Sequence, residues 1–399
     1  MTDNPALQRQ LRLAGVAAFG AMAAMRACDP MLLTLASEFG RSVGEASRVV
    51  SVFAISYGVL QLVYGPLGDR IGKLRVVAVA SAGCAAAAVL ATAAPTLEAL
   101  ILCRALMGAT AAGIIPLTMA WVGDNVRYED RQETLARLLG ATVSGMIAGQ
   151  WLGAWITDAF GWRCAFGLLT LIFIVAAVPL FRDAATAREE AAPTGGPAAG
   201  TGLSNPLTLL REARVRWVLC VAALEGALVF GALAFVPSHL SQQFGLGTSA
   251  AGAVLALYGI GGLLYGRMAR RGLRALGEGG LATAGGATLG LSLLLLSWSG
   301  HWLATLPACL FAGTGFYMLH ATLQTQATQM APARRGAAVA LFACALFFGQ
   351  SIGVIAVSVA ADLGALVWAF SASAVTVFLL GGFVGRGVAP RAAHPVSLS

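Results

Sequence analysis

The sequence predicts an all-α integral membrane protein whose twelve transmembrane helices form two pseudo-symmetric six-helix bundles. Three observations lead to this prediction. Hydrophobic residues make up 58% and charged residues only 11% of the 399 residues, whereas soluble domains carry about 25% charged residues. Apolar runs of about 20 residues, the length that spans a bilayer, recur along the chain. A polar stretch divides these runs into two sets of six, and the two sets resemble each other.

The spans follow from the apolar runs between polar breaks. In the first half they are expected near 13–38, 46–67, 75–95, 98–122, 133–158 and 163–182, and in the second half near 217–240, 249–268, 279–299, 303–330, 336–361 and 363–385. The stretch between the halves contains EEAAPTGGPAAGTGLSNP, which has the composition of a flexible linker. We therefore expect an N-terminal bundle over 1–185, a cytoplasmic linker over 186–215 and a C-terminal bundle over 216–399.

The distribution of basic residues predicts the orientation. Of the 26 Lys and Arg, only Arg41, Arg48 and Arg163 fall on one side of the predicted membrane, while Arg26 and Arg104 lie within spans. All the others fall on the opposite side or in the linker and termini. Because cytoplasmic loops carry the excess of positive charge, both termini are expected in the cytoplasm. The same placement explains the net charge of +8 by contact with anionic lipid and excludes a nucleic-acid partner.

An internal repeat relates the two halves. Tyr57-Gly58 and Tyr64-Gly65 recur 201 positions later as Tyr258-Gly259 and Tyr265-Gly266. Gly149-Gln150 recurs 200 positions later as Gly349-Gln350, in the fifth span of each half. The offset matches the half-length indicated by the linker, so a six-plus-six duplication is expected.

The turn after the second span reads GPLGDRIGKLR, Gly65 to Arg75. It strongly resembles the loop between helices 2 and 3 of the major facilitator superfamily, whose pattern is G-x-L-x-D-R-x-G-R/K. The resemblance implies that this loop, with Asp69 and Arg70 as its charged pair, holds the cytoplasmic side closed. The alternative is a solvated, positively charged turn without a gating role. The matching positions are Gly65, Leu67, Asp69, Arg70, Gly72 and Lys73.

Other segments extend the resemblance across nearly the whole chain. Arg104-x-x-x-Gly108 resembles the intramembrane Arg of the fourth helix of the family. GMIAGQWLGA, Gly145 to Ala154, resembles the antiporter signature G-x-x-x-G-P-x-x-G-G, although Gln150 replaces its Pro and Ala154 its last Gly. Together with GWRCAF at Gly161 to Phe166, these segments are similar to bacterial drug/metabolite:proton antiporters. The resemblance implies proton-coupled efflux by alternating access.

Ionisable residues inside the spans are the main candidate site residues, because each costs several kcal/mol unless it is paired or hydrated. Arg26 and Asp29 share one face of the first span at i, i+3, and Arg104 lies at a similar depth. In the family, helices 1, 4, 7 and 10 line the cavity, so Asp29 and Arg104 are expected to meet there, with Arg26 competing. We expect Asp29 to be the proton-coupling site. The alternative is an Arg/Asp pair that only holds helices together.

A second polar cluster is expected in the other half. Glu225 and His320 lie at comparable depths in the seventh and tenth spans, and His320 could exchange protons beside an acid. Tyr317 and Gln324 lie on the His320 face of the tenth span, which makes them candidate substrate-binding residues. Gln150 and Gln350, the polar residues of the fifth and eleventh spans, are further candidates.

No pattern points to an enzyme, a metal site or a cofactor: the sequence contains no GxxxxGK[ST], HExxH or GxSxG. We expect a monomer in the bacterial cytoplasmic (inner) membrane that takes protons and a small amphipathic molecule as partners. The alternatives are a lipid or lysolipid flippase, a metabolite uniporter or importer of the same fold, and a non-transporting membrane receptor.

Overall fold

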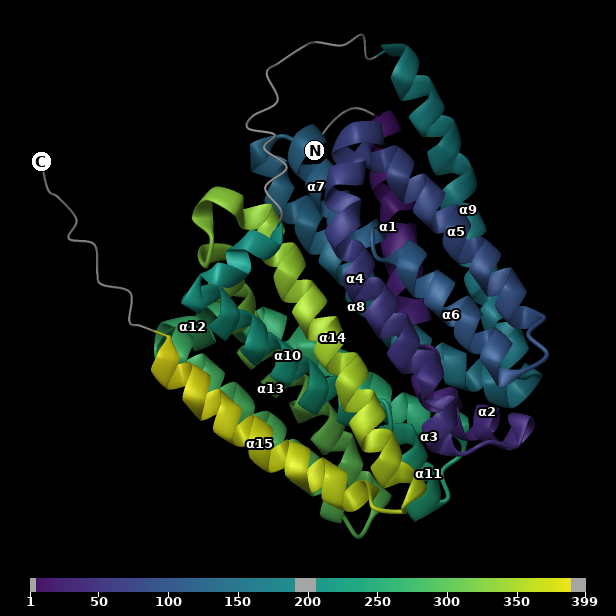
Figure 1. The fold of residues 1–399 in the computed structure, drawn as a ribbon, viewed down its shortest axis with the longest axis vertical. Helices are drawn as coiled ribbons and strands as arrows, with labels where there is room; N and C mark the ends of the chain where they lie inside the picture. The colour runs from purple at the N-terminus through teal and green to yellow at the C-terminus, as the bar shows by residue number, and fades with distance from the viewer. Residues whose placement is uncertain (1–4, 191–205, 389–399) are drawn as a thin grey trace, which may run out of the picture.

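A computed structural model describes residues 5–190 and 206–388, and within these ranges it is helical without any strand. Figure 1 shows two helical bundles side by side, the first built from the N-terminal half and the second from the C-terminal half. The first bundle consists of α1 (Pro5–Arg26), η1 (Asp29–Met31), α2 (Leu32–Phe39), α3 (Val43–Ala46), α4 (Arg48–Ile71), α5 (Lys73–Thr92), α6 (Leu97–Ala111), α7 (Ile114–Asn125), α8 (Tyr128–Phe160) and α9 (Trp162–Glu190).

The second bundle follows in the second half of the chain. It consists of η2 (Pro206–Arg211), α10 (Ala213–Leu233), α11 (Val236–Phe244), α12 (Thr248–Trp298), η3 (Trp302–Ala304), α13 (Thr305–Gln329), η4 (Pro332–Arg334), α14 (Arg335–Asp362) and α15 (Leu366–Gly387). Most of the predicted linker, residues 191–205, lies outside the described residues. Its first residues continue α9, and its last ones form η2 and begin α10.

The helices account for the twelve predicted spans. Ten helical stretches in the described part of the chain are long and apolar enough to cross a membrane. One of them, the stretch Thr248–Trp298, contains two spans that meet at Gly277, whose φ of 67° and ψ of 177° are not helical. The remaining span is α8, whose 33 residues would extend roughly 50 Å. The all-α, twelve-helix prediction is confirmed.

Three spans are broken in the middle. The first passes from α1 through η1 to α2, the fourth breaks between α6 and α7 near Gly113, and the seventh breaks between α10 and α11 at Phe235. The break in the first span falls between Arg26 and Asp29. Interrupted helices expose backbone groups that continuous helices satisfy internally, which is why they are typical of binding regions in transporters.

The turn after the second span is tighter than the sequence predicts. Residues 65–71 belong to the last turns of α4, so the connection to α5 consists of Gly72 alone. Its φ of 94° is a conformation that favours glycine. Gly65, in contrast, lies inside the helix with open space around its Cα, so no close approach requires a glycine there.

Small residues let the helices touch in the same way in both bundles. A Cβ on Gly149 would lie 2.4 Å from the carbonyl oxygen of Ala23, and a Cβ on Gly349 would lie 1.9 Å from that of Ala223. Gly153 packs against Ala27, and Gly353 packs against Ala227. Each pair in the second bundle is 200 residues after its counterpart, so the sequence repeat corresponds to a repeated helix contact.

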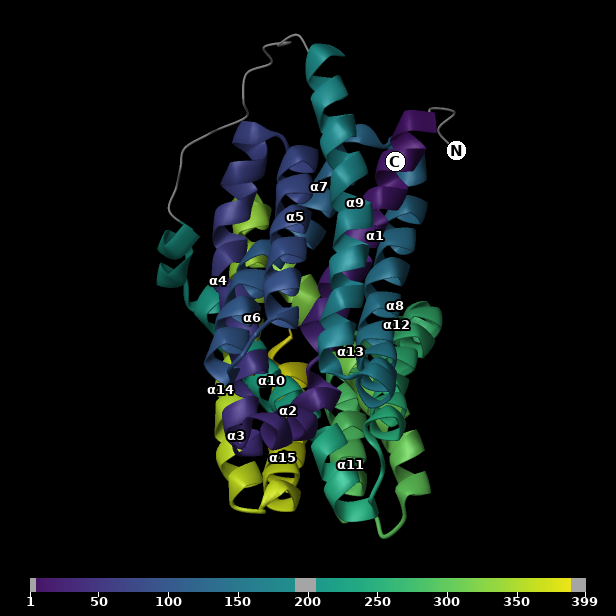
Figure 2. The same ribbon diagram turned by 90° about the vertical axis from the view of Figure 1, so that its right-hand side faces the viewer.

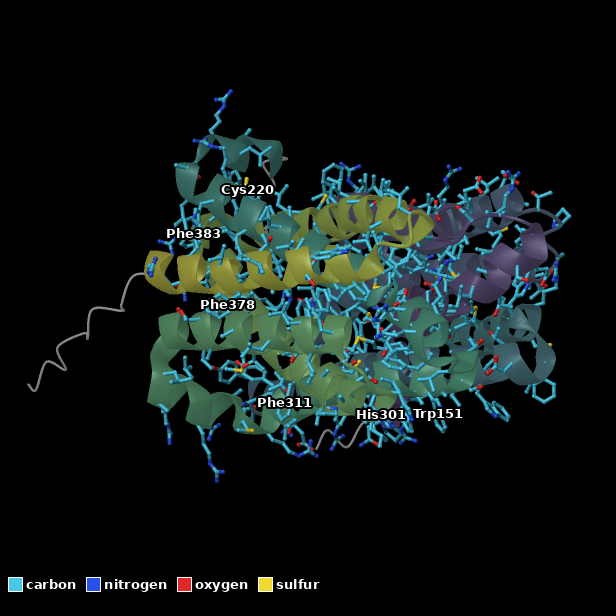
Figure 3. The ribbon with its side chains drawn as sticks, turned by 90° about the horizontal axis from the view of Figure 1, so that it is seen from below. Trp151, Cys220, His301, Phe311, Phe378 and Phe383 are labelled. Atoms are coloured by element: carbon cyan, nitrogen blue, oxygen red, sulfur yellow. The ribbon has the colours of Figure 1, made fainter. Side chains whose placement is uncertain are left out.

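Large apolar side chains cover the outside of the bundles. Trp151, Phe311, Phe378 and Phe383, which are labelled in Figure 3, are each 48–55% exposed. Exposed apolar side chains in this number are unfavourable in water and favourable against lipid tails. The protein is therefore a multi-pass membrane protein.

The two bundles converge at one end, where α2, α3 and α11 lie, and their ribbons spread apart toward the other end (Figures 1 and 2). We call the converging end the latched end, because two carboxylates join the bundles there. Asp158 at the end of α8 accepts hydrogen bonds from Ser249, and Asp362 at the end of α14 accepts them from Ser42 and Gly44. We call the other end, which carries Arg70, Lys73, Arg270 and Arg271, the basic end.

Candidate functional site

The break in the first span places a charged pair in the interior. Arg26 ends α1 and Asp29 begins η1, and Nη1 of Arg26 lies 3.6 Å from Oδ2 of Asp29. Both side chains are almost fully buried. Neither carboxylate oxygen of Asp29 has a hydrogen-bond partner among the described residues, and neither has Nε of Arg26. The pair is therefore close but incompletely satisfied, which is costly in a membrane interior.

Arg26 also joins the two bundles. Its guanidinium carbon lies 4.2 Å from the centre of the Phe230 ring, which belongs to α10 of the second bundle. A guanidinium over an aromatic face is attracted by the ring quadrupole. Any separation of the bundles at this depth must break this contact.

Arg104 does not pair with Asp29. Its Nε donates to the carbonyl oxygen of Val49 at 3.1 Å and its Nη1 donates to that of Ala24 at 2.7 Å. Its guanidinium also covers the Phe53 ring at 4.2 Å. Arg104 thus connects α6 to α1 and α4 inside one bundle. Among the described residues the ion pair of Asp29 is with Arg26, which lies closer to the carboxylate, while backbone carbonyls hold Arg104.

Glu225 and His320 form a second polar pair in the other bundle. Nδ1 of His320 lies 2.9 Å from Oε2 of Glu225, which is fully buried, while Oε1 of Glu225 has no partner among the described residues. The His320 ring stacks on Phe316, with 4.9 Å between ring centroids. The structure therefore brings together the two residues that the sequence places at equal depth.

An aromatic stack connects the Arg26–Asp29 pair to the Glu225–His320 pair. Phe230, which lies under Arg26, contacts Phe316 edge to face at 5.0 Å. Phe316 in turn stacks on His320, which bonds to Glu225. Arg26, Phe230, Phe316, His320 and Glu225 form a continuous series of contacts across the bundle interface, which we call the central stack.

The two glutamines occupy equivalent buried positions. Gln150 on α8 and Gln350 on α14 are almost fully buried, and the Oε1 atom of each lacks a hydrogen-bond partner in the described part of the chain. With the free oxygens of Asp29 and Glu225, they form a set of buried acceptors without donors. Buried polar groups are normally paired, so such a set is expected where a ligand or proton completes the bonding.

The other two predicted binding residues differ in position. Tyr317 is part-buried, and its ring lies 5.2 Å from Phe316 and 6.5 Å from Tyr258. It therefore borders the central stack. Gln324, in contrast, is exposed.

The loop motif forms contacts only within its own bundle. Nζ of Lys73 lies 2.5 Å from Oδ2 of Asp124 and 3.3 Å from Oδ1 of Asp69. Arg70 is exposed at the end of α4. In this conformation the motif residues therefore connect α4, α5 and α7 at the basic end, and none of these ion pairs reaches the second bundle.

The family comparison agrees with this architecture. The family model described as "Major Facilitator Superfamily" matches residues 14–354, which is most of the chain. The chain belongs to the major facilitator superfamily. The superfamily and its fold point to a transporter rather than an enzyme, and they imply a small-molecule substrate and a lipid bilayer around the protein.

Relatives within the superfamily include export proteins. The chain is 28% identical over 231 residues to a chloramphenicol resistance protein of Streptomyces lividans, a match that covers 57% of each chain. It is 26% identical over 209 residues to the multidrug efflux pump LfrA of Mycolicibacterium smegmatis, covering 52% of this chain and 40% of that one. The match to an uncharacterised MFS-type transporter of Bacillus subtilis covers 82% of both chains at 24% identity.

Solved structures share the fold. A bacterial homologue of the human lysosomal transporter Spinster, in an inward-facing and unoccupied conformation, matches with a TM-score of 0.70 over 96% of this chain and 98% of that one, at 16% identity. The nucleoside transporter NupG matches with a TM-score of 0.71 over the same shares, at 15% identity. At these identities the likeness concerns the superfamily fold alone.

Proposed function

We propose that the protein is a proton-coupled secondary transporter that exports a small amphipathic organic molecule by alternating access. The observation that carries this proposal is the central stack, which joins the buried acid of one bundle to that of the other. Asp29 pairs with Arg26, Arg26 covers Phe230, and the series ends at His320 and Glu225. A scaffold or receptor would have no need of ionisable groups at this depth.

Coupling follows from the position of Arg26. Its guanidinium contacts both the carboxylate of Asp29 and the Phe230 ring of the opposite bundle. Protonation of Asp29 would neutralise the carboxylate that attracts Arg26 within the first bundle. Separation of the bundles would break the contact between Arg26 and Phe230 of the second bundle. Because the two contacts share one side chain, the proton affinity of Asp29 and the bundle arrangement depend on each other.

The substrate class follows from the chemistry of the interior. Aromatic rings border the central stack, and most of the buried polar atoms without a partner among the described residues are acceptors, such as those of Asp29, Glu225, Gln150 and Gln350, while Arg26 and Arg104 add donors. An apolar molecule with a few hydrogen-bond donors complements this lining. Export as the direction of transport is supported by two relatives, a chloramphenicol resistance protein and a multidrug efflux pump.

The orientation and location belong to the same proposal. With the basic end in the cytoplasm, both termini are cytoplasmic and the latched end faces outward, in a bacterial inner membrane. We propose a monomer, since each chain contains both bundles of the transport unit. In the opposite state, Asp69 and Arg70 would meet the second bundle and close the basic end.

The test is transport in proteoliposomes with an imposed pH gradient, using fluorescent dyes and small metabolites as substrates. Wild type is compared with Asp29→Asn, with Glu225→Gln, and with Glu98→Gln as a control, because Glu98 is an exposed acid that pairs with Arg41 in its own bundle. We expect gradient-driven accumulation by wild type and the control but not by either buried variant. Full gradient-driven transport by Asp29→Asn contradicts the role of Asp29. No movement under any gradient would favour a receptor or a flippase.

A further inference from the structure

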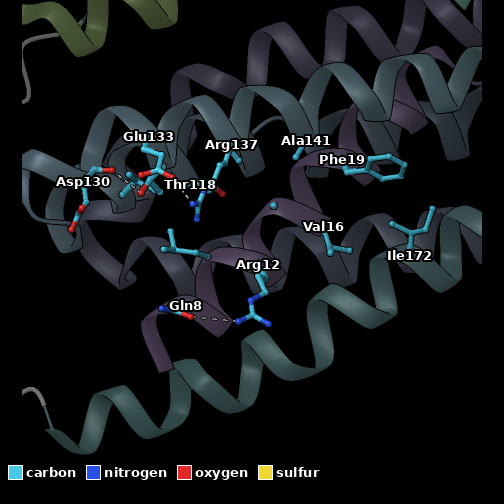
Figure 4. Close-up of a pocket in the computed structure, with 15 residues that line it drawn as sticks. Gln8, Arg12, Val16, Phe19, Thr118, Asp130, Glu133, Arg137, Ala141 and Ile172 are labelled. Carbon is cyan, nitrogen blue, oxygen red and sulfur yellow. Dashed lines mark hydrogen bonds and ion pairs between the residues drawn. The ribbon is translucent and has the colours of Figure 1, made fainter. Parts of the chain in front are cut away.

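One cavity of the first bundle lies away from the bundle interface. It has a volume of about 740 Å³, within the usual size of a small-molecule pocket, and all its lining residues come from α1, α7, α8 and α9 of the first bundle. Figure 4 shows it between α8 and α9, with α1 behind, and in Figure 2 the basic-end half of α1 is visible between these two helices. The cavity is therefore a crevice in the side of one bundle, separate from the central stack.

The crevice changes from charged to apolar along its length. Gln8, Arg12, Asp130, Glu133 and Arg137 line its outer part at the basic end. Gly15, Val16, Phe19, Ala141 and Ile172 line its deeper part. From Gln8 to Phe19 the α1 helix rises roughly 16 Å. This is about the thickness of one leaflet of a hydrocarbon core of roughly 30 Å.

The charges of the outer part favour a phosphate. Asp130 pairs with Arg127, and Glu133 pairs with Arg137. Arg12 is exposed, and among the described residues its Nη2 donates a long hydrogen bond of 3.5 Å to Oε1 of Gln8 and forms no ion pair. The mouth is lined by two arginines and two acids; counted with Arg127, which pairs with Asp130 but does not line the crevice, it has one guanidinium, Arg12, without an ion pair among the described residues. A guanidinium is well suited to phosphate oxygens because its N–H groups match their geometry.

We propose that this crevice binds one glycerophospholipid of the leaflet at the basic end. Its phosphate contacts Arg12, and one acyl chain lies along the apolar part between Gly15 and Phe19. The occupant is a lipid because the polarity changes over one leaflet depth and the crevice opens sideways between α8 and α9. Bound in this way, the lipid fills a space between helices that the side chains leave open. The proposal does not depend on the transported substrate or on the direction of transport.

The chain offers a matched pair of variants for the test. A Cβ on Gly15 would meet no atom within 4 Å, and the same is true of Gly167, which lies on α9 but does not line the crevice. A side chain at Gly15 therefore starts from open space within the crevice, so Gly15→Leu should occupy it, and Gly167→Leu adds the same side chain elsewhere. Comparable thermal unfolding of the two variants establishes that both are folded.

The measurement is photo-crosslinking in nanodiscs with a phospholipid that carries a diazirine near the end of one acyl chain, followed by peptide mass spectrometry. We expect adducts on the α1 segment 15–19 in wild type and Gly167→Leu, and their loss in Gly15→Leu. Arg12→Gln should reduce the yield about tenfold, because a charge-assisted hydrogen bond is lost. A diacylglycerol with the same diazirine chain should label wild type weakly and should not respond to Arg12→Gln.

Several outcomes would overturn the proposal. Equal adduct yields in Gly15→Leu and Gly167→Leu would mean that the lipid does not enter the crevice. Equal labelling by phospholipid and diacylglycerol would remove the phosphate from the interaction. If excess inorganic phosphate abolished the lipid adducts, the crevice would be a site for free phosphate instead of a phospholipid. None of these readouts is transport, so their failure is distinguishable from failure of the proposed export function.

Discussion

Asp158 and Ser249 hold the two bundles together across the latched end. Oδ2 of Asp158 accepts hydrogen bonds from the backbone N of Ser249 at 2.6 Å and from its Oγ at 2.5 Å. Asp362 forms the counterpart, with Oδ2 accepting from Oγ of Ser42 at 2.9 Å and Oδ1 from N of Gly44 at 2.8 Å. Each acid ends the fifth helix of its bundle and contacts the N-terminal region of the second helix of the other. The two latches are therefore related by the pseudo-symmetry of the fold.

Removing both latches should open this end. Hydrogen bonds to a charged group contribute about 1.5–3 kcal/mol each, so Asp158→Ala with Asp362→Ala should shift the balance of conformations by tenfold or more. The measurement is the labelling rate, with an impermeant maleimide, of a cysteine replacing Ile147, which packs beneath Gly259 at the interface. Cys164 and Cys220, which are exposed, are first replaced by Ser.

Glu98→Ala is the control for the latch variants. It removes an acid whose ion pair with Arg41 stays within the first bundle. We expect its labelling rate to equal that of the parent protein. If the double variant also labels at the parent rate, apolar packing alone closes this end.

Gly353 should be among the least replaceable residues of the second bundle. A Cβ there would lie 2.1 Å from the carbonyl oxygen of Ala227, so Gly353→Ala must push α14 away from α10. We expect a loss of about 1–3 kcal/mol, the usual cost of overpacking. Thermal unfolding in detergent checks this against Gly382→Ala, because nothing lies within 4 Å of a Cβ at Gly382. Equal melting temperatures would contradict the close contact.

Much of the fold could be predicted from the sequence. The apolar runs locate the spans, and the spacing of the glycine-containing pairs reveals the repeat. The pairing of Glu225 with His320 was also accessible, because equal depth in two cavity helices brings them together. The partners of Arg104 could not be predicted. They are the backbone carbonyl oxygens of Val49 and Ala24, and every residue has a backbone carbonyl, so the sequence does not distinguish these two.

Residues at the bundle interface were the hardest to predict. Phe230 resembles any other apolar residue of a span, and its role under Arg26 depends on how the bundles meet. Asp158 and Asp362 look like polar ends of two spans. When the fifth and eleventh spans are aligned by Gln150 and Gln350, Asp362 falls four residues beyond the position that corresponds to Asp158, so the repeat does not single out the two acids.

Arg104 should be required for stability rather than for proton coupling. A lysine cannot donate to both Val49 and Ala24 or cover the Phe53 ring as a planar guanidinium does. Arg104→Lys should therefore cost about 1–3 kcal/mol for each carbonyl left unsatisfied. The melting temperature should fall, whereas Arg137→Lys, which changes an exposed pair with Glu133, should leave it unchanged. If Arg104→Lys kept the melting temperature but abolished proton-coupled transport, Arg104 would have a role in the transport mechanism instead of in stability.

The Arg26–Asp29 pair allows its structural and coupling roles to be separated. Asp29→Asn leaves the guanidinium of Arg26 buried without its counter-charge, and breaking a buried pair in this way costs about 3–5 kcal/mol. Arg26→Gln added to Asp29→Asn removes the unpaired charge, so the double variant should recover most of the lost thermal stability. If the pair is only structural, transport driven by a pH gradient should recover with stability. If Asp29 carries the proton, the double variant should fold as well as wild type and still fail to accumulate substrate, because no titratable carboxyl remains at the break between α1 and η1.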